Sequence, residues 1–292
     1  MLKTYWNEKL QMVETELARL IPAESSLCPT LSEAMNYSLL AGGKRLRPVL
    51  LMAAADAVGA TGTDFLRTAC ALEMIHTYSL IHDDLPAMDN DDYRRGKLTN
   101  HKVFGDGMAV LAGDALLTMA FEIMARQSAT TPEKTLRIVQ EMSRAAGPAG
   151  MVGGQAIDLL SENKSIGMEL LQQMHMAKTG ALFLAAIRSG AILGDATDLQ
   201  LAALTKYAEC FGLVFQITDD ILDVTGTEAA IGKPVGSDER NKKSTYVTLT
   251  SLERAKELAE ATVEKALEAL VPFGAEADFL RGIVKYLITR DK

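Results

Sequence analysis

The sequence predicts an all-α fold of ten or more helices around a central cavity. Long segments rich in Ala, Leu, Met and Glu carry apolar residues at three- and four-residue spacing, the period of a half-buried helix. Short alternating runs closed by Asn-Gly or Asp-Gly turns, which would indicate strands, are missing from the sequence. Hydroxyl side chains at predicted helix starts are followed by Glu, Gln or Pro: Thr30 with Glu33, Thr131 with Pro132, Thr197 with Gln200, and Thr250 with Glu253.

Length and composition favour one domain over residues 1–292. No Pro-, Gly- or Ser-rich linker divides the chain, and an apolar fraction of 48% is enough for a large core. A net charge of −8 argues against nucleic acid as a partner. Three cysteines without metal-ligand spacing are typical of reduced thiols in a cytoplasmic protein. We find no signal-peptide pattern and no uninterrupted apolar run of about 18 residues, so we expect no stable membrane insertion.

The first predicted helices frame a basic turn at residues 42–48, with the sequence GGKRLRP. Two glycines allow the backbone to turn closely, and Lys44, Arg45 and Arg47 place three cations within four positions. Such a turn suits an anionic ligand, although basic turns at helix ends are also common without one.

The next predicted helix runs through His76 to Asp83, which share one face two turns apart. Five aspartates then fall within residues 83–92, and Arg94 and Arg95 follow. Carboxylates this close repel one another and are costly to hold without a cation. Oxygen ligands suit Mg²⁺, and guanidinium groups suit phosphate oxygens. The cluster therefore indicates metal with phosphate, with a solvated acidic loop as the alternative.

Pro86 shapes this cluster. On an unbroken helix Asp83 and Asp89 would lie about 120° apart and could not easily share one ion. Proline tends to end a helix just before itself, so we expect the helix to end near Leu85. The following loop would then bring Asp89 back towards Asp83.

A second acidic cluster lies inside an apolar stretch, residues 211–224. Asp219 and Asp223 are about 40° apart on a helix, and Gln216 lies on a neighbouring stripe. Acids inside an apolar helix are costly unless they are paired or bind metal. Two such clusters, each at the end of an apolar helix, predict two walls of one cavity with metal ions between them.

These motifs resemble those of the trans-isoprenyl diphosphate synthases, and in particular the bacterial type of farnesyl diphosphate synthases. Residues 83–89 resemble the first aspartate-rich motif in its bacterial form, residues 219–223 the second, and residues 42–48 the homoallylic-site motif. The resemblance runs from about Leu39 to Tyr246 in recognisable blocks. It implies an isoprenoid-synthase-type helical bundle, isoprenoid diphosphates as small-molecule partners, and a homodimer.

The resemblance also implies roles for individual residues. Three Mg²⁺ ions, with the substrate diphosphate, would be held by Asp83, Asp89 and Asp219, while Asp84, Asp220 and Asp223 would orient bound waters. Isopentenyl diphosphate would be bound by Lys44, Arg47, His76 and Arg95. The allylic diphosphate would be bound by Arg94 and Lys178, with Lys233 and Lys243 added from a basic loop. The reacting carbocation would be stabilised by oxygens of Lys178, Thr179 and Gln216.

The implied reaction is head-to-tail condensation of isopentenyl diphosphate with dimethylallyl or geranyl diphosphate, after ionisation to an allylic carbocation. In the bacterial type that the sequence resembles, an aromatic residue five positions before the first aspartate goes with a C15 product. Tyr78 stands at that position, so the resemblance implies farnesyl diphosphate. Ideal helix angles put Tyr78 about 140° from Asp83 and the small Ser79 only about 40° away. A C20 product, geranylgeranyl diphosphate, is therefore the alternative.

Some assignments stay open at this stage. Gln155 and Asp158 resemble a family block that lines the cavity, but they also fit an ordinary helix-surface pair. Arg45 fits a solvated or structural residue, and the basic tail from Arg290 to Lys292 has no assigned role. A terpene cyclase would share the fold and the first acidic motif, but it would not need cations for a second diphosphate. It is the less favoured alternative.

Overall fold

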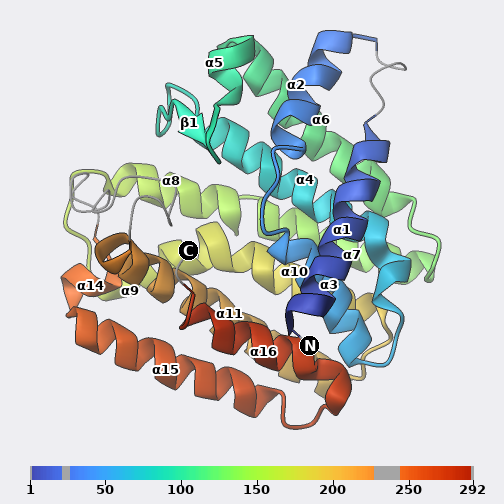
Figure 1. The fold of residues 1–292 in the computed structure, drawn as a ribbon, viewed down its shortest axis with the longest axis vertical. Helices are drawn as coiled ribbons and strands as arrows, with labels where there is room; N and C mark the ends of the chain where they lie inside the picture. Colours follow the sequence, from blue (N-terminus) through green and yellow to red (C-terminus); the bar gives the residue numbers. More distant parts are fainter. Residues whose placement is uncertain (1, 22–26, 227–243, 291–292) are drawn as a thin grey trace.

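Helices account for most of the structure, a computed structural model that describes residues 2–21, 27–226 and 244–290 (Figure 1). The first half contains α1 (Leu2–Leu20), α2 (Pro29–Leu39), α3 (Leu46–Ala57), η2 (Gly62–Phe65), α4 (Leu66–Asp83), α5 (Asn100–Phe104), α6 (Asp106–Ala125) and α7 (Pro132–Ala146). The second half contains α8 (Met151–Ser161), α9 (Met168–His175), η3 (Met176–Gly180), α10 (Ala181–Leu193), α11 (Asp198–Thr225), α14 (Tyr246–Leu249), α15 (Leu252–Ala269), η4 (Ala275–Ala277) and α16 (Asp278–Leu287). The predicted all-α fold with ten or more helices is confirmed.

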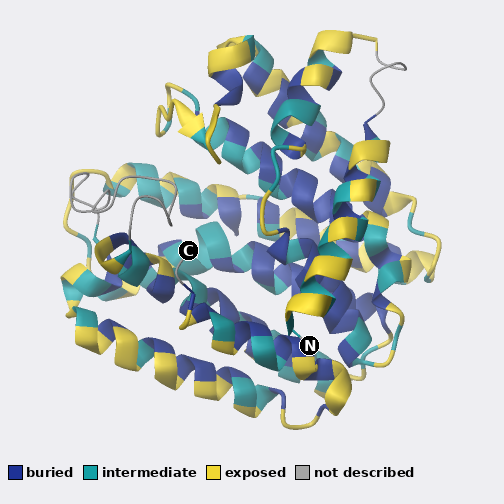
Figure 2. Ribbon diagram, in the orientation of Figure 1, coloured by how far each residue is buried: buried dark blue, intermediate teal, exposed yellow. Residues whose placement is uncertain are grey.

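The core is built around α3, α4 and α10, which are mostly buried (Figure 2). These helices are apolar on nearly all sides, so they can only be stable inside the bundle. A Cβ atom at Gly190 would lie 2.0 Å from the carbonyl oxygen of Leu51, so α10 and α3 cross in direct backbone contact. The rigid centre holds the ends of α4 and α11, where the acidic motifs lie, in fixed positions.

One small element was not predicted. β1 (Tyr93–Arg94) and β2 (Lys97–Leu98) form an antiparallel hairpin in which Arg94 pairs with Lys97. Its two-residue turn has positive φ at both positions, 54° at Arg95 and 76° at Gly96, as right-twisted hairpins favour. Strands of two residues are too short to produce an alternating pattern, so the only sequence signal was the Arg-Gly pair.

The predicted helix starts are partly right. Thr131 caps α7 before Pro132, and Thr197 with Gln200 forms a reciprocal capping box on α11. The other two predictions are wrong. α2 begins at Pro29, before Thr30, and α15 is capped by Ser251, whose side chain accepts from the N–H of Arg254. The start of α2 lies earlier than predicted because proline favours the first helical position. The cap of α15 lies one residue later because the neighbouring serine takes that role.

Two helical stretches, Asp106–Ala125 and Met168–Leu193, are long and apolar enough to cross a membrane by length and composition alone. In the fold 39% of the first window and 61% of the second are buried. Core helices of soluble proteins have the same properties, so these two stretches are weak grounds for membrane insertion. The low burial of α6 leaves apolar side chains on its outer face, with Leu111 54% exposed.

Candidate active site

The first acidic motif sits at the end of α4, which ends at Asp83, two residues before the predicted end at Leu85. The loop then turns back, because the N–H of Asp89 donates to the carbonyl oxygen of Asp83 at 2.9 Å. Asp83 is partly buried and Asp89 is exposed. The return of Asp89 towards Asp83, expected from Pro86, is therefore present.

Asp84 and Arg94 form a tight pair inside this motif. Arg94 donates to Asp84 Oδ1 from Nε at 2.7 Å and from a terminal nitrogen at 2.6 Å. Asp84 is 3% exposed, and burial raises its pKa to about 6 although Arg94 acts in the opposite direction. The hairpin places Arg94 on Asp84, so the positive charge of Arg94 is already partly balanced before any phosphate binds.

A second cation, Lys178, also meets the first motif. Its Nζ lies 2.7 Å from Asp158 Oδ2 and 4.0 Å from Asp83 Oδ1. Gln155 donates to Asp83 Oδ1 at 2.7 Å. The two residues of α8 whose role was left open, Gln155 and Asp158, thus lie directly beside Asp83 and Lys178.

Lys178 and Thr179 belong to η3, a π-helical turn inside the continuous α9–α10 helix. Glycines pack on both sides of this turn. A Cβ atom at Gly154 in α8 would lie 2.2 Å from the backbone nitrogen of Lys178, and one at Gly212 in α11 would lie 3.0 Å from Gly180 Cα. The π turn is wedged between α8 and α11, and π turns inside α-helices occur frequently at functional sites.

The second acidic motif lies in the last turns of α11, where Asp219 is exposed while Asp220 and Asp223 are buried. Asp220 Oδ2 accepts from the backbone N–H of Tyr246 at 2.7 Å, which fixes its carboxylate. Asp219 Oδ1 lies 3.6 Å from a terminal nitrogen of Arg290. Gln216 lies on the same helix and is partly buried.

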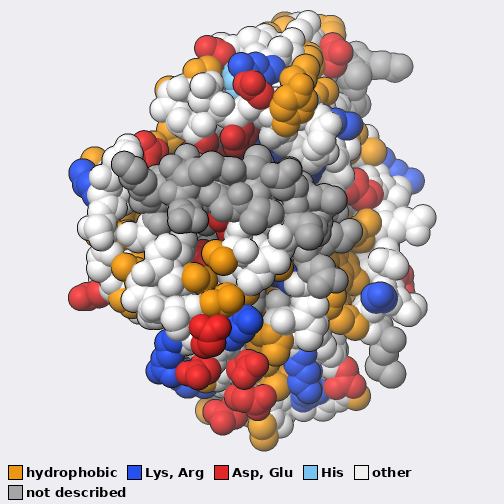
Figure 3. Space-filling view, turned by 60° about the vertical axis from the view of Figure 1, so that its left-hand side comes forward, with side chains coloured by type: hydrophobic (Ala, Val, Ile, Leu, Met, Phe, Trp, Pro, Cys, Tyr) orange, Lys and Arg blue, Asp and Glu red, His pale blue; other side chains and the backbone are white. Residues whose placement is uncertain are grey.

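Acidic side chains are visible in the hollowed part of one face of the molecule (Figure 3). Within the part of the chain that the structure describes, no three Asp, Glu, His or Cys side chains gather as a ready-made metal cage. Mg²⁺ is normally held by one or two carboxylates, with waters and substrate phosphates completing its shell. The accessible Asp83, Asp89 and Asp219 carboxylates therefore fit Mg²⁺ that binds together with a diphosphate.

The predicted cations for a second diphosphate come from three elements. Arg47 is the second residue of α3 and stacks on Phe183, with Cζ 4.3 Å from the ring centroid. Arg95, in the hairpin turn, donates to the carbonyl oxygen of Gly42. Burial and the nearby Arg47 hold the pKa of His76 well below its usual value, so His76 is neutral.

Arg47 forms no ion pair within the part of the chain that the structure describes. Its Nε is buried and makes no hydrogen bond, and no carboxylate lies within ion-pair distance of its guanidinium among the described residues. Burial lowers the pKa of Arg47 to about 10; the charge of Glu73 acts in the opposite direction, and Arg95 adds to the lowering. A partly buried guanidinium in this state is stabilised by an incoming anion.

Arg45 is structural and not solvated. It is 2% exposed and donates to Glu73 Oε1 at 2.8 Å and to Glu14 Oε1 at 2.6 Å. Its φ of 46° turns the chain between Lys44 and Arg47. The two carboxylate partners were missed by sequence reasoning. Glu73 offered one signal, as an acid inside an apolar helix three residues before His76.

The predicted chain-length residues lie on different faces of α4. Tyr78 is 6% exposed and packs edge-on against His82, with ring centroids 5.5 Å apart. Burial and the nearby Asp114 of α6 raise its pKa, so the ring faces α6. The Ser79 hydroxyl donates to its own helix at the carbonyl of His76. Lys233 and Lys243, predicted to contact diphosphate, lie outside the described residues.

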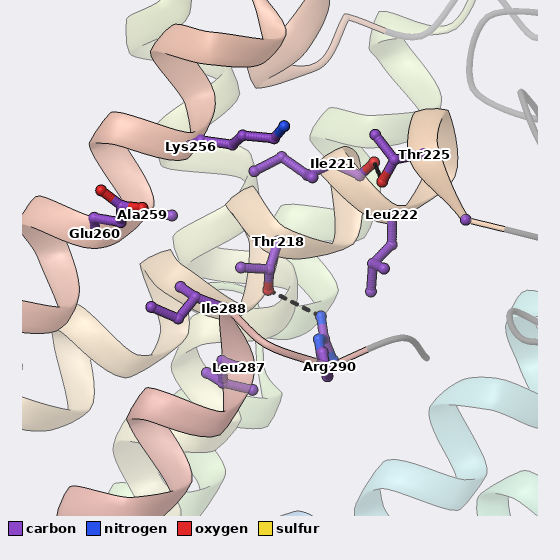
Figure 4. A pocket seen from close by; sticks show the side chains of 11 residues that line it. Thr218, Ile221, Leu222, Thr225, Lys256, Ala259, Glu260, Leu287, Ile288 and Arg290 are labelled. Carbon is purple, nitrogen blue, oxygen red and sulfur yellow. Dashed lines mark hydrogen bonds between the residues drawn. The ribbon is translucent and has the colours of Figure 1, made fainter.

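A cavity of about 540 Å³ opens between α11, α15 and α16 (Figure 4). Its lining includes Thr218, Leu222 and Arg290. On α11 Thr218 and Leu222 project about 100° and 60° away from Asp219. Arg290, which lines this cavity, also lies 3.6 Å from Asp219 Oδ1, so the cavity borders the second acidic motif. The central cavity between the two acidic motifs stays a prediction.

The fold and the two acidic motifs define a prenyltransferase with an all-α architecture. The model of the polyprenyl synthetase family matches residues 28–276, and the chain belongs to that family. It is 47% identical to a farnesyl diphosphate synthase of Geobacillus stearothermophilus over 99% of this chain and 98% of that protein. It is 48% identical to geranylgeranyl pyrophosphate synthase 3, chloroplastic, of Arabidopsis thaliana, over 99% of this chain and 81% of the relative.

Solved structures show the same architecture. A geranylgeranyl pyrophosphate synthetase from Pyrococcus horikoshii superposes with a TM-score of 0.91 at 33% identity, covering 99% of this chain and 98% of that one. An FPP/GFPP synthase from Zymomonas mobilis superposes with a TM-score of 0.88 at 40% identity, covering 98% of both chains. The similar proteins thus carry names for more than one product length.

Proposed function

We propose that this chain condenses isopentenyl diphosphate with dimethylallyl or geranyl diphosphate and releases farnesyl diphosphate. The observation that carries the proposal is the separation of two charge environments. Arg47, with Arg95 and neutral His76 beside it, offers positive charge without a bound metal. Asp83 and Asp219 offer negative charge, so a diphosphate could bind beside them only together with a metal ion. Two diphosphates with different metal requirements fit this arrangement.

The residues of the acidic side would act on the allylic substrate. When bound with the diphosphate at Asp83, Asp89 and Asp219, Mg²⁺ neutralises the leaving pyrophosphate. Lys178, held 4.0 Å from Asp83, would add a cation to the same group. The bond that breaks joins the allylic carbon to the diphosphate oxygen, and the electron pair leaves with pyrophosphate.

The remaining steps need positioning more than acid or base groups. Oxygens of Thr179 and Gln216 would stabilise the carbocation while Arg47 holds isopentenyl diphosphate for attack. The double bond of isopentenyl diphosphate forms the new carbon–carbon bond, and the proton lost afterwards goes to the departing pyrophosphate. An apolar surround keeps water from quenching the cation.

Tyr78 supports the C15 product. Its buried ring fills space against α6, about one and a half turns before Asp83, and would block a growing chain that extends between α4 and α6. The C20 product is the second candidate because Ser79, on the face nearer to Asp83, is small and bonded to its own helix.

The test is a product assay. Purified protein would be incubated with Mg²⁺, isopentenyl diphosphate and geranyl diphosphate, and the dephosphorylated alcohols would be sized by chromatography. We expect farnesol from the wild type and from Tyr78→Phe, which keeps the ring, and longer alcohols from Tyr78→Ala. Geranylgeraniol from the wild type would support the C20 alternative. A cyclic hydrocarbon, with isopentenyl diphosphate unconsumed, would refute condensation itself.

We also propose that the protein is a homodimer that pairs through α6. Val110 and Leu111 are apolar side chains of α6 that are 39% and 54% exposed. Exposed apolar side chains on one helix face are typical of surfaces that a partner protein covers. Sedimentation of the wild type should give a dimer mass, and Leu111→Lys should shift the protein towards monomer. A monomeric wild type at micromolar concentration would contradict this proposal.

A further inference from the structure

The N-terminal helix holds the loop that carries Lys44. Trp6 in α1 donates its indole N–H to the carbonyl oxygen of Lys44 at 2.9 Å. The next residue, Arg45, donates to Glu14 of the same helix. The match to the family model begins at residue 28, so α1 lies outside the matched part. The position of the Lys44 loop thus depends on α1 at two points.

Trp6 also contacts the C-terminal helix. Its ring meets the ring of Tyr286 in α16 edge-on, with centroids 5.8 Å apart and planes at 85°. A Cβ atom at Gly282 would lie 3.3 Å from the side chain of Leu2, so α1 and α16 are closely packed there. The N-terminus lies beside α16 in Figure 1. Trp6 therefore stands between the Lys44 loop and α16.

The turn after α16 links Tyr286 to Arg290. The carbonyl oxygen of Tyr286 accepts from both the N–H and the hydroxyl of Thr289, at 3.0 and 3.2 Å. These two bonds fix the turn, and Arg290 is the next residue. A shift of Arg290 therefore acts on Tyr286 through a short, hydrogen-bonded segment.

Arg290 is seated on the second acidic motif. Its terminal nitrogen donates to Thr218 Oγ1 at 3.0 Å (Figure 4) and to the carbonyl oxygen of Phe215 at 3.2 Å. The same nitrogen lies 3.6 Å from Asp219 Oδ1. Arg290 is 7% exposed and its Nε makes no hydrogen bond within the described residues. This arrangement gives Asp219 a protein cation as its neighbour in the absence of metal.

A second contact chain runs through the core between the same two regions. The guanidinium of Arg290 stacks on Phe215, with Cζ 4.4 Å from the ring centroid. Phe215 packs on Phe183 with centroids 5.0 Å apart, and Arg47 stacks on Phe183. Arg290 and Arg47 are therefore the two ends of one column of stacked side chains.

We propose that Trp6 and Tyr286 are positioning residues that couple the two diphosphate sites, an inference that rests on the function proposed above. Two states are involved. Without ligand Arg290 lies on Asp219, and a metal-bound diphosphate at Asp219 competes with it for that carboxylate. The displaced Arg290 shifts the turn at Thr289, and Tyr286 and Trp6 transmit the shift to the Lys44 loop. Because coupling is reciprocal, isopentenyl diphosphate changes affinity at the acidic site by the same factor.

Trp6 is the only tryptophan of the chain, so its fluorescence reports on this junction directly. Wild-type protein with Mg²⁺ would be titrated with inorganic pyrophosphate, following Trp6 emission and, in parallel, the heat of binding. We expect the emission to change and to saturate with the calorimetric Kd. The same titration in EDTA measures the emission change caused by an anion bound at the basic site alone, and we expect Mg²⁺ to add a further change that saturates with binding at the acidic site.

Three variants separate the coupling from direct effects. Lys44→Ala removes the nearby ammonium but keeps the carbonyl that Trp6 contacts, so the emission change should persist. Tyr286→Leu should bind magnesium pyrophosphate with a Kd within twofold of the wild type while losing the emission change. Tyr286→Phe keeps the ring and should respond as the wild type does.

A kinetic measurement completes the test. Trp6→Phe keeps an aromatic ring against Tyr286 but removes the N–H donor, and one such bond contributes about 0.5–1.5 kcal/mol. We expect the KM for isopentenyl diphosphate to rise about 2- to 12-fold, with kcat unchanged. The coupling is overturned if pyrophosphate binds to the wild type without an emission change, or if Tyr286→Leu responds fully. If magnesium pyrophosphate gives no binding heat at all, the proposed function fails first, and the coupling with it.

Discussion

Arg45→Met should destabilise the fold and loosen the loop between Lys44 and Arg47. Arg45 is buried among Glu14, Glu73 and the carbonyl oxygen of Leu39, which its guanidinium contacts at 2.6, 2.8 and 2.6 Å. Burial lowers the pKa of Arg45, but Glu73 and Glu14 outweigh burial and the net direction is upward. The folded state therefore stabilises the charged form of Arg45. Methionine would preserve the apolar part of the side chain but would lose the charge and the hydrogen bonds.

The magnitude follows from the carboxylate left behind. The Glu73 side chain is 2% exposed, and removing its cation leaves a buried charge uncompensated, at a cost of about 3–5 kcal/mol. The Glu14 side chain is 31% exposed and water can solvate it, so the loss of its ion pair adds little to the destabilisation. Against a typical total of about 5–15 kcal/mol the loss is large. At about 2 °C per kcal/mol, Tm should fall by about 6–10 °C.

The assay is urea unfolding of the wild type, Arg45→Met, Glu73→Gln and the double variant. Replacing both partners removes the buried charge, so the double variant should recover much of the stability lost by Arg45→Met. If Arg45→Met lowered the free energy of unfolding by less than about 1 kcal/mol, Arg45 and Glu73 would not form a buried ion pair in solution, and the reasoning would be refuted. A rise in KM for isopentenyl diphosphate in the same variant would tie the loop to Lys44.

Three further outcomes concern other contacts. Gly154→Ala would push a Cβ atom against the backbone of Lys178, so kcat should fall more than about tenfold, whereas Gly107→Ala, with open space around it, should not change it. The hydrogen bonds of Arg188 hold the pKa of Glu141 below its usual 4.5. The stabilisation of about 1–2 kcal/mol lost in Glu141→Gln should thus be complete at pH 7 and disappear as pH falls below 4.5, measured by Tm. EDTA should abolish product formation without changing the far-ultraviolet circular dichroism, and Mg²⁺ should restore activity.

The sequence predicted the helices well because their signals are local. The N-cap at Thr131 and the capping box at Thr197 need only residues within one turn, and both are present. The error at Thr250 has an equally local cause. Ser251 is the next residue and caps as well as threonine does, so pattern alone could not choose between them.

Which residues belong to the site was more predictable than what each one touches. Asp83, Asp89 and Lys178 were identified from motifs, and the loop and the π turn bring them to one place. The pairing of Lys178 with Asp158 spans 20 residues and depends on how α8 packs against η3. No local pattern records such a distance, so Gln155 and Asp158 could not be assigned from the sequence.

Two of the three arginines predicted to bind phosphate prove to be in opposite electrostatic situations. Arg94 is balanced by Asp84, whereas the partly buried Arg47 has no carboxylate at ion-pair distance within the described residues and its pKa is lowered to about 10. Under the proposed function, a diphosphate at Arg47 would gain from a cation that makes no ion pair within the described residues and would need no metal. Under the same proposal, a diphosphate beside Asp83 would meet negative charge and would bind only together with a cation. Chelation should accordingly weaken binding at the acidic side and leave binding at Arg47 unchanged.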